Sequence, residues 1–149
     1  MDKIRVTKEF NFEIAHALWN YDGACANIHG HSYRLFVTVI GEPIIDTKSH
    51  KLGMVIDFGE LKKIVNSEII LPLDHALILS QIAYDSIRGP ENKMFAKIHI
   101  VNYQPTCENM VLDFVKKIQK TLPHHLQLHS LKLHETATSF AEWFASDNQ

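Results

Sequence analysis

Residues 25–40 read CANIHGHSYRLFVTVI, and both the expected sheet and a candidate site follow from this stretch. His29 and His31 lie two residues apart, so both imidazoles leave the same face of an extended strand. Apolar side chains continue that parity as far as Val39, and the β-branched and aromatic residues among them favour a strand. The stretch therefore predicts a half-buried strand over residues 29–40 that begins with two histidines.

An amphipathic stretch upstream supplies a third histidine. Over residues 7–16, one parity carries three apolar side chains and an imidazole: Phe10, Phe12, Ile14 and His16. This alternation predicts a second strand that ends at His16. Two imidazoles on one face and a third from a nearby strand make three neutral nitrogen ligands, the set of catalytic zinc sites with an open fourth position. The three histidines therefore predict a zinc (Zn2+) centre.

Downstream of these two strands, the pattern alternates between strands and helices. The expected elements are a short strand at 54–56, a helix from Asp57 to Pro72, a loop at 80–92, a strand at 97–103, a helix from Pro105 to Pro123 and a strand at 128–136. This order predicts the α+β class, with helices on one face of a mainly antiparallel sheet.

Length and composition bound the classes of protein that are possible. The chain has 149 residues, and residues 1–149 are expected to form a single domain. A formal net charge of -2 gives no electrostatic case for a nucleic-acid partner. No apolar run approaches the roughly 20 residues of a membrane helix, and the amino terminus lacks the apolar core of a signal peptide. The two cysteines are therefore expected to be reduced thiols in a cytoplasmic protein.

Cys25 lies four residues before His29, and its spacing is compatible with two interpretations. It is either a fourth zinc ligand in a non-catalytic, zinc-stabilised binding domain, or a free thiol beside a metal with an open position. A metal and imidazoles nearby favour the thiolate, which suits a nucleophile or general base. Cys107, at the start of a helix, is interpreted as a packing residue.

Two other places carry titratable groups in apolar surroundings. Asp74 and His75 are adjacent, and two interpretations are open. A bend after Pro72 would let them contact each other and share a proton with a third group, or they are a capping aspartate beside a surface histidine. Glu135 has the parity of the preceding leucines, where a carboxylate is costly unless it is paired. It either binds a ligand with adjacent N–H donors, such as a pterin or guanine, or lies at a strand end in solvent.

Six short motifs follow one another along the chain: Phe12-Glu13-x-Ala15-His16, Cys25-x-x-x-His29-Gly30-His31-Ser32-Tyr33, Met54-x-Ile56-Asp57-Phe58-x-x-Leu61-Lys62, Leu73-Asp74-His75, Pro105-Thr106-x-Glu108-Asn109 and Glu135-Thr136. In this order they resemble the 6-pyruvoyl-tetrahydropterin synthase family, over nearly the whole chain. The resemblance implies the tunnelling fold, a four-stranded antiparallel sheet with two helices on one face. It also implies a homohexamer of two stacked trimers with active sites at subunit interfaces.

The resemblance assigns roles to particular residues. It implies that His16, His29 and His31 bind zinc. It implies that Cys25 is the catalytic thiol, with Asp74 and His75 as its proton-relay pair. Glu135 is then the residue that anchors the pterin ring, and Thr106 and Glu108 line the same pocket. The implied substrate is 7,8-dihydroneopterin triphosphate, converted to a 6-carboxytetrahydropterin with release of acetaldehyde and triphosphate. The pyruvoyl-forming reaction on the same substrate is the alternative.

Spacing within the second motif favours the carboxy-forming reaction. Three residues separate Cys25 from His29, whereas the pyruvoyl-forming synthases of animals typically place five there. The chain also departs from the family pattern in two places. Residues 82–97 form a longer segment than in compact members, expected to alter a pocket loop, and the tail after Thr136 is expected to cover a sheet edge.

Overall fold

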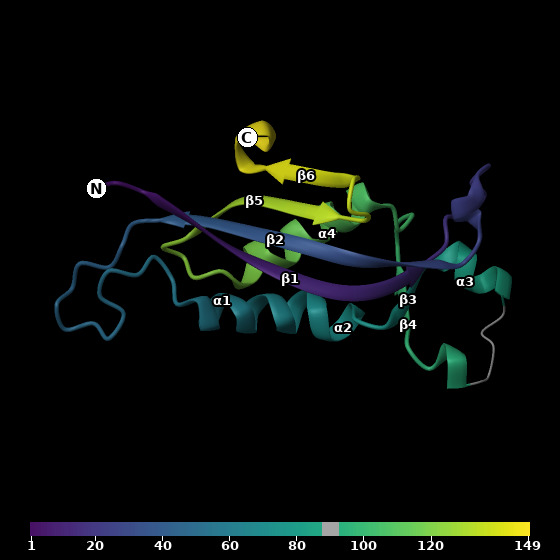
Figure 1. Ribbon diagram of the computed structural model, residues 1–149, viewed down its shortest axis with the longest axis horizontal. Helices are drawn as coiled ribbons and strands as arrows, with labels where there is room; N and C mark the ends of the chain where they lie inside the picture. Colours follow the sequence, from purple (N-terminus) through teal and green to yellow (C-terminus); the bar gives the residue numbers. More distant parts are fainter. Residues whose placement is uncertain (88–92) are drawn as a thin grey trace.

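The computed structural model describes residues 1–87 and 93–149, which contain one six-stranded sheet in the order β4-β3-β1-β2-β5-β6 (Figure 1). The strands are β1 (Ile4–His16), β2 (His29–Gly41), β3 (Ala76–Ser80), β4 (Ile98–Val101), β5 (Gln127–His134) and β6 (Phe140–Phe144). The helices are α1 (Phe58–Val65), α2 (Leu71–Leu73), α3 (Gln81–Ile87) and α4 (Cys107–Thr121). A π-helical turn, Asn66–Ile70, joins α1 to α2.

The long antiparallel pair β1–β2 is the centre of the fold. Each strand has 13 residues, and they pair from Ile4 opposite Gly41 to His16 opposite His29. Alternate side chains of both strands are buried, as the period-2 pattern predicts. The predicted parities are therefore confirmed, and the histidines lie on the buried face at one end of the pair.

Two amphipathic helices cover that face of the sheet. The core joins the inward side chains of the strands to those of α1 and α4, among them Leu61, Val65, Phe114 and Ile118. Both predicted helix starts are confirmed. Asp57 accepts from the N–H of Gly59 at 2.7 Å, and the Thr106 hydroxyl accepts from the N–H of Asn109 at 3.3 Å.

The sheet differs from the expected four-stranded antiparallel one in number and direction of strands. It has six strands, and β3 pairs in parallel with both β1 and β4. The first four residues of β3 (ALILS) are all apolar, so the strand lacks the alternation that marks a half-buried strand. The tail does cover a sheet edge, and it does so as the strand β6, paired with β5.

Two smaller expectations also need correction. Residues 54–56 form an irregular connection instead of a strand, and residues 81–87 form α3 where a loop was expected. The rest of that expected loop, residues 88–92, lies outside the described residues. Among the described helices, none has both the length and the apolar character needed to cross a membrane.

Candidate metal centre and active-site cavities

The pairing of β1 with β2 assembles the three predicted histidines. His16 lies directly opposite His29, and His31 follows two residues along the same face. One ring nitrogen from each of the three histidines lies within 4.8 Å of the others. The side chain of His16 is buried, and the rings of His29 and His31 pack against it at centroid distances of 4.6 and 5.2 Å. The histidines thus form one compact cluster at the end of the strands.

Backbone carbonyls fix which nitrogen of two rings carries the hydrogen. Nδ1 of His16 lies 2.8 Å from the carbonyl oxygen of Pro105, and Nδ1 of His29 lies 2.7 Å from that of Asn27. A carbonyl oxygen only accepts, so both Nδ1 atoms donate and, in the neutral rings, both Nε2 atoms hold lone pairs. Burial lowers the pKa of His16, although its bond to Pro105 opposes this, so the neutral ring is favoured.

The free nitrogens of the cluster fit a divalent metal ion. Nε2 of His16 and Nε2 of His29 lie 3.0 Å apart, a distance at which two lone pairs repel unless a cation lies against them. Nε2 of His31 is buried and has no hydrogen-bond partner among the described residues. Metal-binding histidines usually donate their other nitrogen to a carbonyl or carboxylate, as His16 and His29 do. The cluster therefore has the donor set and the orientation of a metal site.

Glu135 faces this cluster from the end of β5. Its Oε1 lies 3.7 Å from Nε2 of His16 and 3.8 Å from Nε2 of His31, and accepts from the Tyr33 hydroxyl at 3.3 Å. Burial, and then the charge of Glu135, raise the pKa of Tyr33 well above its usual value, so the hydroxyl remains a donor. The side chain of Glu135 is 27% exposed, so part of the carboxylate remains accessible from the adjoining cavity.

That cavity, here called the thiol cavity, unites most of the predicted site residues. It measures about 310 Å³, and its lining includes His16, Cys25, Thr106, Cys107, Glu108 and Glu135. Cys25 comes from the 3₁₀ turn Ala24–Ala26, and its carbonyl accepts from the N–H of Leu18 at 2.9 Å. Its thiol is free and partly exposed, and the metal-competent cluster found in the described residues does not include it. Among the described residues, the metal-competent cluster therefore consists of the three histidines.

Cys107 also lines the thiol cavity, but its side chain packs in the hydrophobic core. Cys107 is buried in the core, and its thiol donates to the carbonyl oxygen of Leu133 at 3.3 Å. Burial raises the pKa of Cys107 to about 11, which keeps the thiol protonated at neutral pH. The interpretation of Cys107 as a packing residue is consistent with this position.

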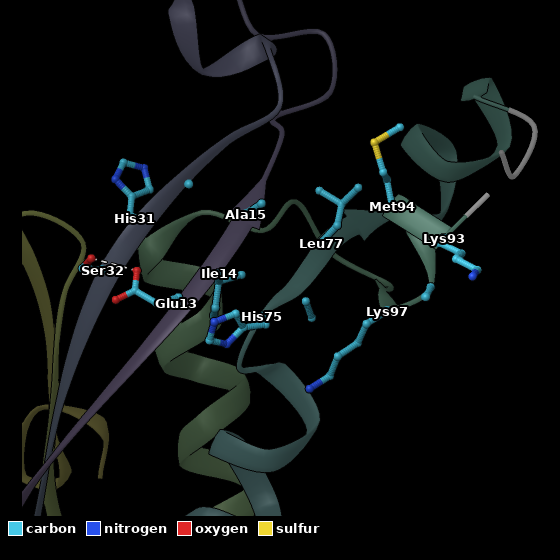
Figure 2. Close-up of a pocket in the computed structure, with 13 residues that line it drawn as sticks. Glu13, Ile14, Ala15, His31, Ser32, His75, Leu77, Lys93, Met94 and Lys97 are labelled. Carbon is cyan, nitrogen blue, oxygen red and sulfur yellow. Dashed lines mark hydrogen bonds between the residues drawn. The ribbon is translucent and has the colours of Figure 1, made fainter. Parts of the chain in front are cut away.

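His75 lines a different cavity, here called the turn cavity (Figure 2), and Asp74 directly precedes His75 in the chain. The turn cavity measures about 660 Å³, and its lining includes Glu13, His31, Ser32, His75, Lys93 and Lys97. Asp74 Oδ1 lies 3.0 Å from Nδ1 of His75, so the two adjacent side chains do contact each other. A hydrogen bond from the backbone N–H of Glu13, and then the contact with His75, lower the pKa of Asp74.

The predicted catalytic set is thus divided between two cavities of one chain. Within the described part of the chain, the lining of the thiol cavity includes neither Asp74 nor His75. The side chain of His75 is 76% exposed and faces outward. Each site also has a contact that was not predicted from the sequence. Near the cluster, the hydroxyl of Tyr33, which shares the parity of His31, donates to Glu135. At the turn cavity, the hydroxyl of Ser32 donates to Glu13 at 2.7 Å.

Fold and cluster together define a class: an α+β protein of the tunnelling fold with a metal-competent cluster of three histidines. The chain belongs to the 6-pyruvoyl tetrahydropterin synthase family, whose family model matches residues 5–146. It is similar to the 6-carboxy-5,6,7,8-tetrahydropterin synthase of Haemophilus influenzae, with 36% identity over 141 residues that cover 93% of this chain and 97% of that protein. The protein of the same name from Rickettsia typhi is 33% identical over 141 residues, covering 93% and 99% of the two chains.

A solved structure supports the assignment of the fold. The 6-pyruvoyl tetrahydropterin synthase of Caenorhabditis elegans superposes with a TM-score of 0.67 and covers 97% of each chain. Its sequence identity to this chain is 24%, so the likeness concerns the fold alone.

Proposed function

We propose that the protein is a zinc-dependent 6-carboxy-5,6,7,8-tetrahydropterin synthase, a carbon–carbon lyase of queuosine biosynthesis. In this proposal it converts 7,8-dihydroneopterin triphosphate to 6-carboxytetrahydropterin and releases acetaldehyde and triphosphate. The observation that carries the proposal is the set of imidazole nitrogens turned toward one another beside a cavity that also holds Cys25 and Glu135. Relatives from Haemophilus influenzae and Rickettsia typhi bear this name.

His16, His29 and His31 would hold the zinc ion, which supplies Lewis-acid polarisation of substrate oxygens when bound. Zinc is proposed because three imidazoles with one position left open are typical of its catalytic sites. The carbonyl contacts of His16 and His29 orient both rings before the metal binds, so little of the site has to reorganise.

Glu135 is proposed to anchor the pterin ring. Among the described residues, its side-chain contacts run through Oε1, which leaves Oε2 for the N–H donors along the ring edge. Thr106 and Glu108 would border the ring from the first turn of α4. A ring held at Glu135 would direct its C6 side chain toward the histidines, because the carboxylate lies next to the cluster.

Cys25 is the proposed base that removes a proton from the C6 side chain, and His75 the group that returns one. Asp74 would orient His75 through the contact at Nδ1, so that Nε2 carries out the transfer. Triphosphate would leave as its C–O bond breaks, and one water would add to the side-chain carbon attached to C6. Cleavage of the bond from that carbon to the next would release the other two carbons as acetaldehyde and leave the first as the carboxylate.

Since the two groups lie at different cavities, we propose that Cys25 of one subunit works with His75 of a second copy. The assembly in this proposal is a homohexamer of two stacked trimers with sites at the interfaces. β4 and β6 are the two edges of the sheet, and edge strands of identical chains can pair head to tail to close a ring. Within it, residues 1–149 would act as one domain, in the cytoplasm, on a small-molecule substrate.

The direct test is to incubate zinc-loaded protein with 7,8-dihydroneopterin triphosphate and to measure acetaldehyde and the pterin product together. The proposal predicts equal amounts of acetaldehyde and 6-carboxytetrahydropterin. Triphosphate release without acetaldehyde would indicate the pyruvoyl-forming reaction. A folded, zinc-replete protein with no turnover would contradict both reactions and favour a binding domain.

A further inference from the structure

Lys97, one residue before β4, makes several well-defined contacts. The ammonium of Lys97 donates to the carbonyl oxygen of Leu71 at 2.9 Å and to that of Asp74 at 2.6 Å. The carbonyl of Lys97 accepts from the backbone N–H of Leu77 at 2.9 Å. Lys97 therefore contacts both sides of the turn between α2 and β3, and Figure 2 shows its side chain reaching toward that turn.

The turn needs support because its backbone is strained. His75 has a φ of +61°, in the left-handed region that residues with a Cβ rarely occupy. Such a conformation persists only where the surroundings hold it. On one side, β1 does so: the N–H of His75 donates to the carbonyl of Glu13 at 2.7 Å, and Asp74 accepts from the N–H of Glu13 at 2.9 Å. Lys97 supplies the contacts from the other side.

A lysine suits this position chemically. Leu71 and Asp74 belong to the carboxyl end of the helical segment that runs from α1 through α2, where backbone carbonyls lack donors within the helix and carry partial negative charge. An ammonium group offers three donors and a positive charge, so it can satisfy two carbonyls at once. An apolar side chain of similar length would offer neither.

We infer that Lys97 is a positioning residue for the Asp74–His75 pair. By holding the carbonyl of Asp74, it fixes the direction in which the turn presents the imidazole of His75. The inference rests on the proposed function, since it assumes that His75 transfers a proton. Lys97 and His75 both line the turn cavity.

Steady-state kinetics of Lys97→Met, Lys97→Arg and the wild-type protein test this role. Displacing a catalytic group by about 1 Å can cost about 100-fold in rate, so Lys97→Met should lower kcat about 10- to 100-fold. KM should change less than about twofold, because the thiol cavity that binds the ring is untouched. Lys97→Arg should recover most of the loss, since its guanidinium also donates to two carbonyls. Lys116→Met, the same change on an exposed face of α4, is the control and should match the wild type.

A double variant separates positioning from a general loss of stability. In a His75→Ala background, Lys97→Met should reduce kcat less than about twofold further, because the group that it positions is absent. Equal losses in both backgrounds, or a wild-type kcat for Lys97→Met, would overturn the inference. Should Lys97→Met not fold, Lys97→Gln keeps one donor group and should give an intermediate loss. A wild-type protein without 6-carboxy product would instead overturn the proposed function.

Discussion

The thiol cavity and the turn cavity differ in how completely one chain builds them. Beside the first, three histidines of β1 and β2 are aligned by strand register, and carbonyls set the orientation of two of the rings; His31 also lines the second cavity. In the second, an exposed imidazole stands on a strained turn that hydrogen bonds from β1 and Lys97 hold in place. The comparison teaches that one chain by itself assembles the metal-competent histidines, whereas it leaves the imidazole of His75 exposed at the surface.

The largest expected effect comes from removing a metal ligand. His31→Ala should lower zinc occupancy at least about 10-fold and abolish measurable turnover, because two imidazoles hold zinc poorly. Metal content after dialysis and product formation measure the two effects. His134→Ala is a matched control, since a ring nitrogen of His134 is also buried with no hydrogen-bond partner among the described residues, but the residue lies outside the cluster. If His31→Ala retained full zinc, the cluster would not be the metal site.

The next effect separates the thiol from the metal. Cys25→Ala should lower kcat about 10²–10⁴-fold, the usual contribution of a positioned acid–base group, while zinc content stays at the wild-type level. Cys107→Ala is the control, and it should keep most of the activity because its thiol is buried and protonated. Loss of zinc in Cys25→Ala would show that this thiol is a ligand and that the cavity is a closed structural site.

A smaller effect is expected at the ring anchor. Glu135→Gln removes the negative charge that would face the N–H donors of the pterin, and it should raise KM about 10- to 100-fold, as for loss of a charged hydrogen-bond partner. The thermal midpoint should change little, because the carboxylate is partly exposed. An unchanged KM with a reduced kcat would place Glu135 in the chemical step instead.

The smallest effect concerns the stability of the turn. The pKa of Asp74 is lowered in the folded protein, so its contribution to stability is present above the unfolded value of about 3.9 and is lost as pH falls through the folded pKa. Asp74→Asn should therefore unfold more easily at pH 7, by about 1 kcal/mol or less because the site is exposed, and equal the wild type in strong acid. Thermal midpoints measured across pH would check this; a difference that grows toward low pH would contradict it.

Sequence patterns predicted the features that depend on a single strand or helix, such as which side chains share a face. The parities of β1 and β2 predicted which histidines share a face, and Asp57 and Thr106 predicted the helix starts. The register that sets His16 opposite His29 did not follow from the sequence, because the connection of residues 17–28 is long enough to allow several registers.

Local sequence patterns could not predict the conformation of the turn at His75 or the division of the site between two cavities. Nothing in the sequence signals a left-handed histidine, since glycine is the usual residue there. The contacts of Lys97 join residues separated by 23 and 26 positions, so only the tertiary structure reveals them. The same holds for the two cavities, whose walls combine strands that lie far apart in the chain.

Subunit complementation tests the central claim, that each active site combines the metal cluster and Cys25 of one chain with the imidazole of His75 from another. Cys25→Ala and His75→Ala are each expected to be nearly inactive, and the two would be co-expressed with different tags so that mixed oligomers can be isolated. If each site combines Cys25 of one copy with His75 of another, random mixing should restore about one quarter of wild-type activity, because one pairing in four carries both groups. Mixed oligomers as inactive as either variant alone would contradict the account, since both groups would then have to come from the same chain.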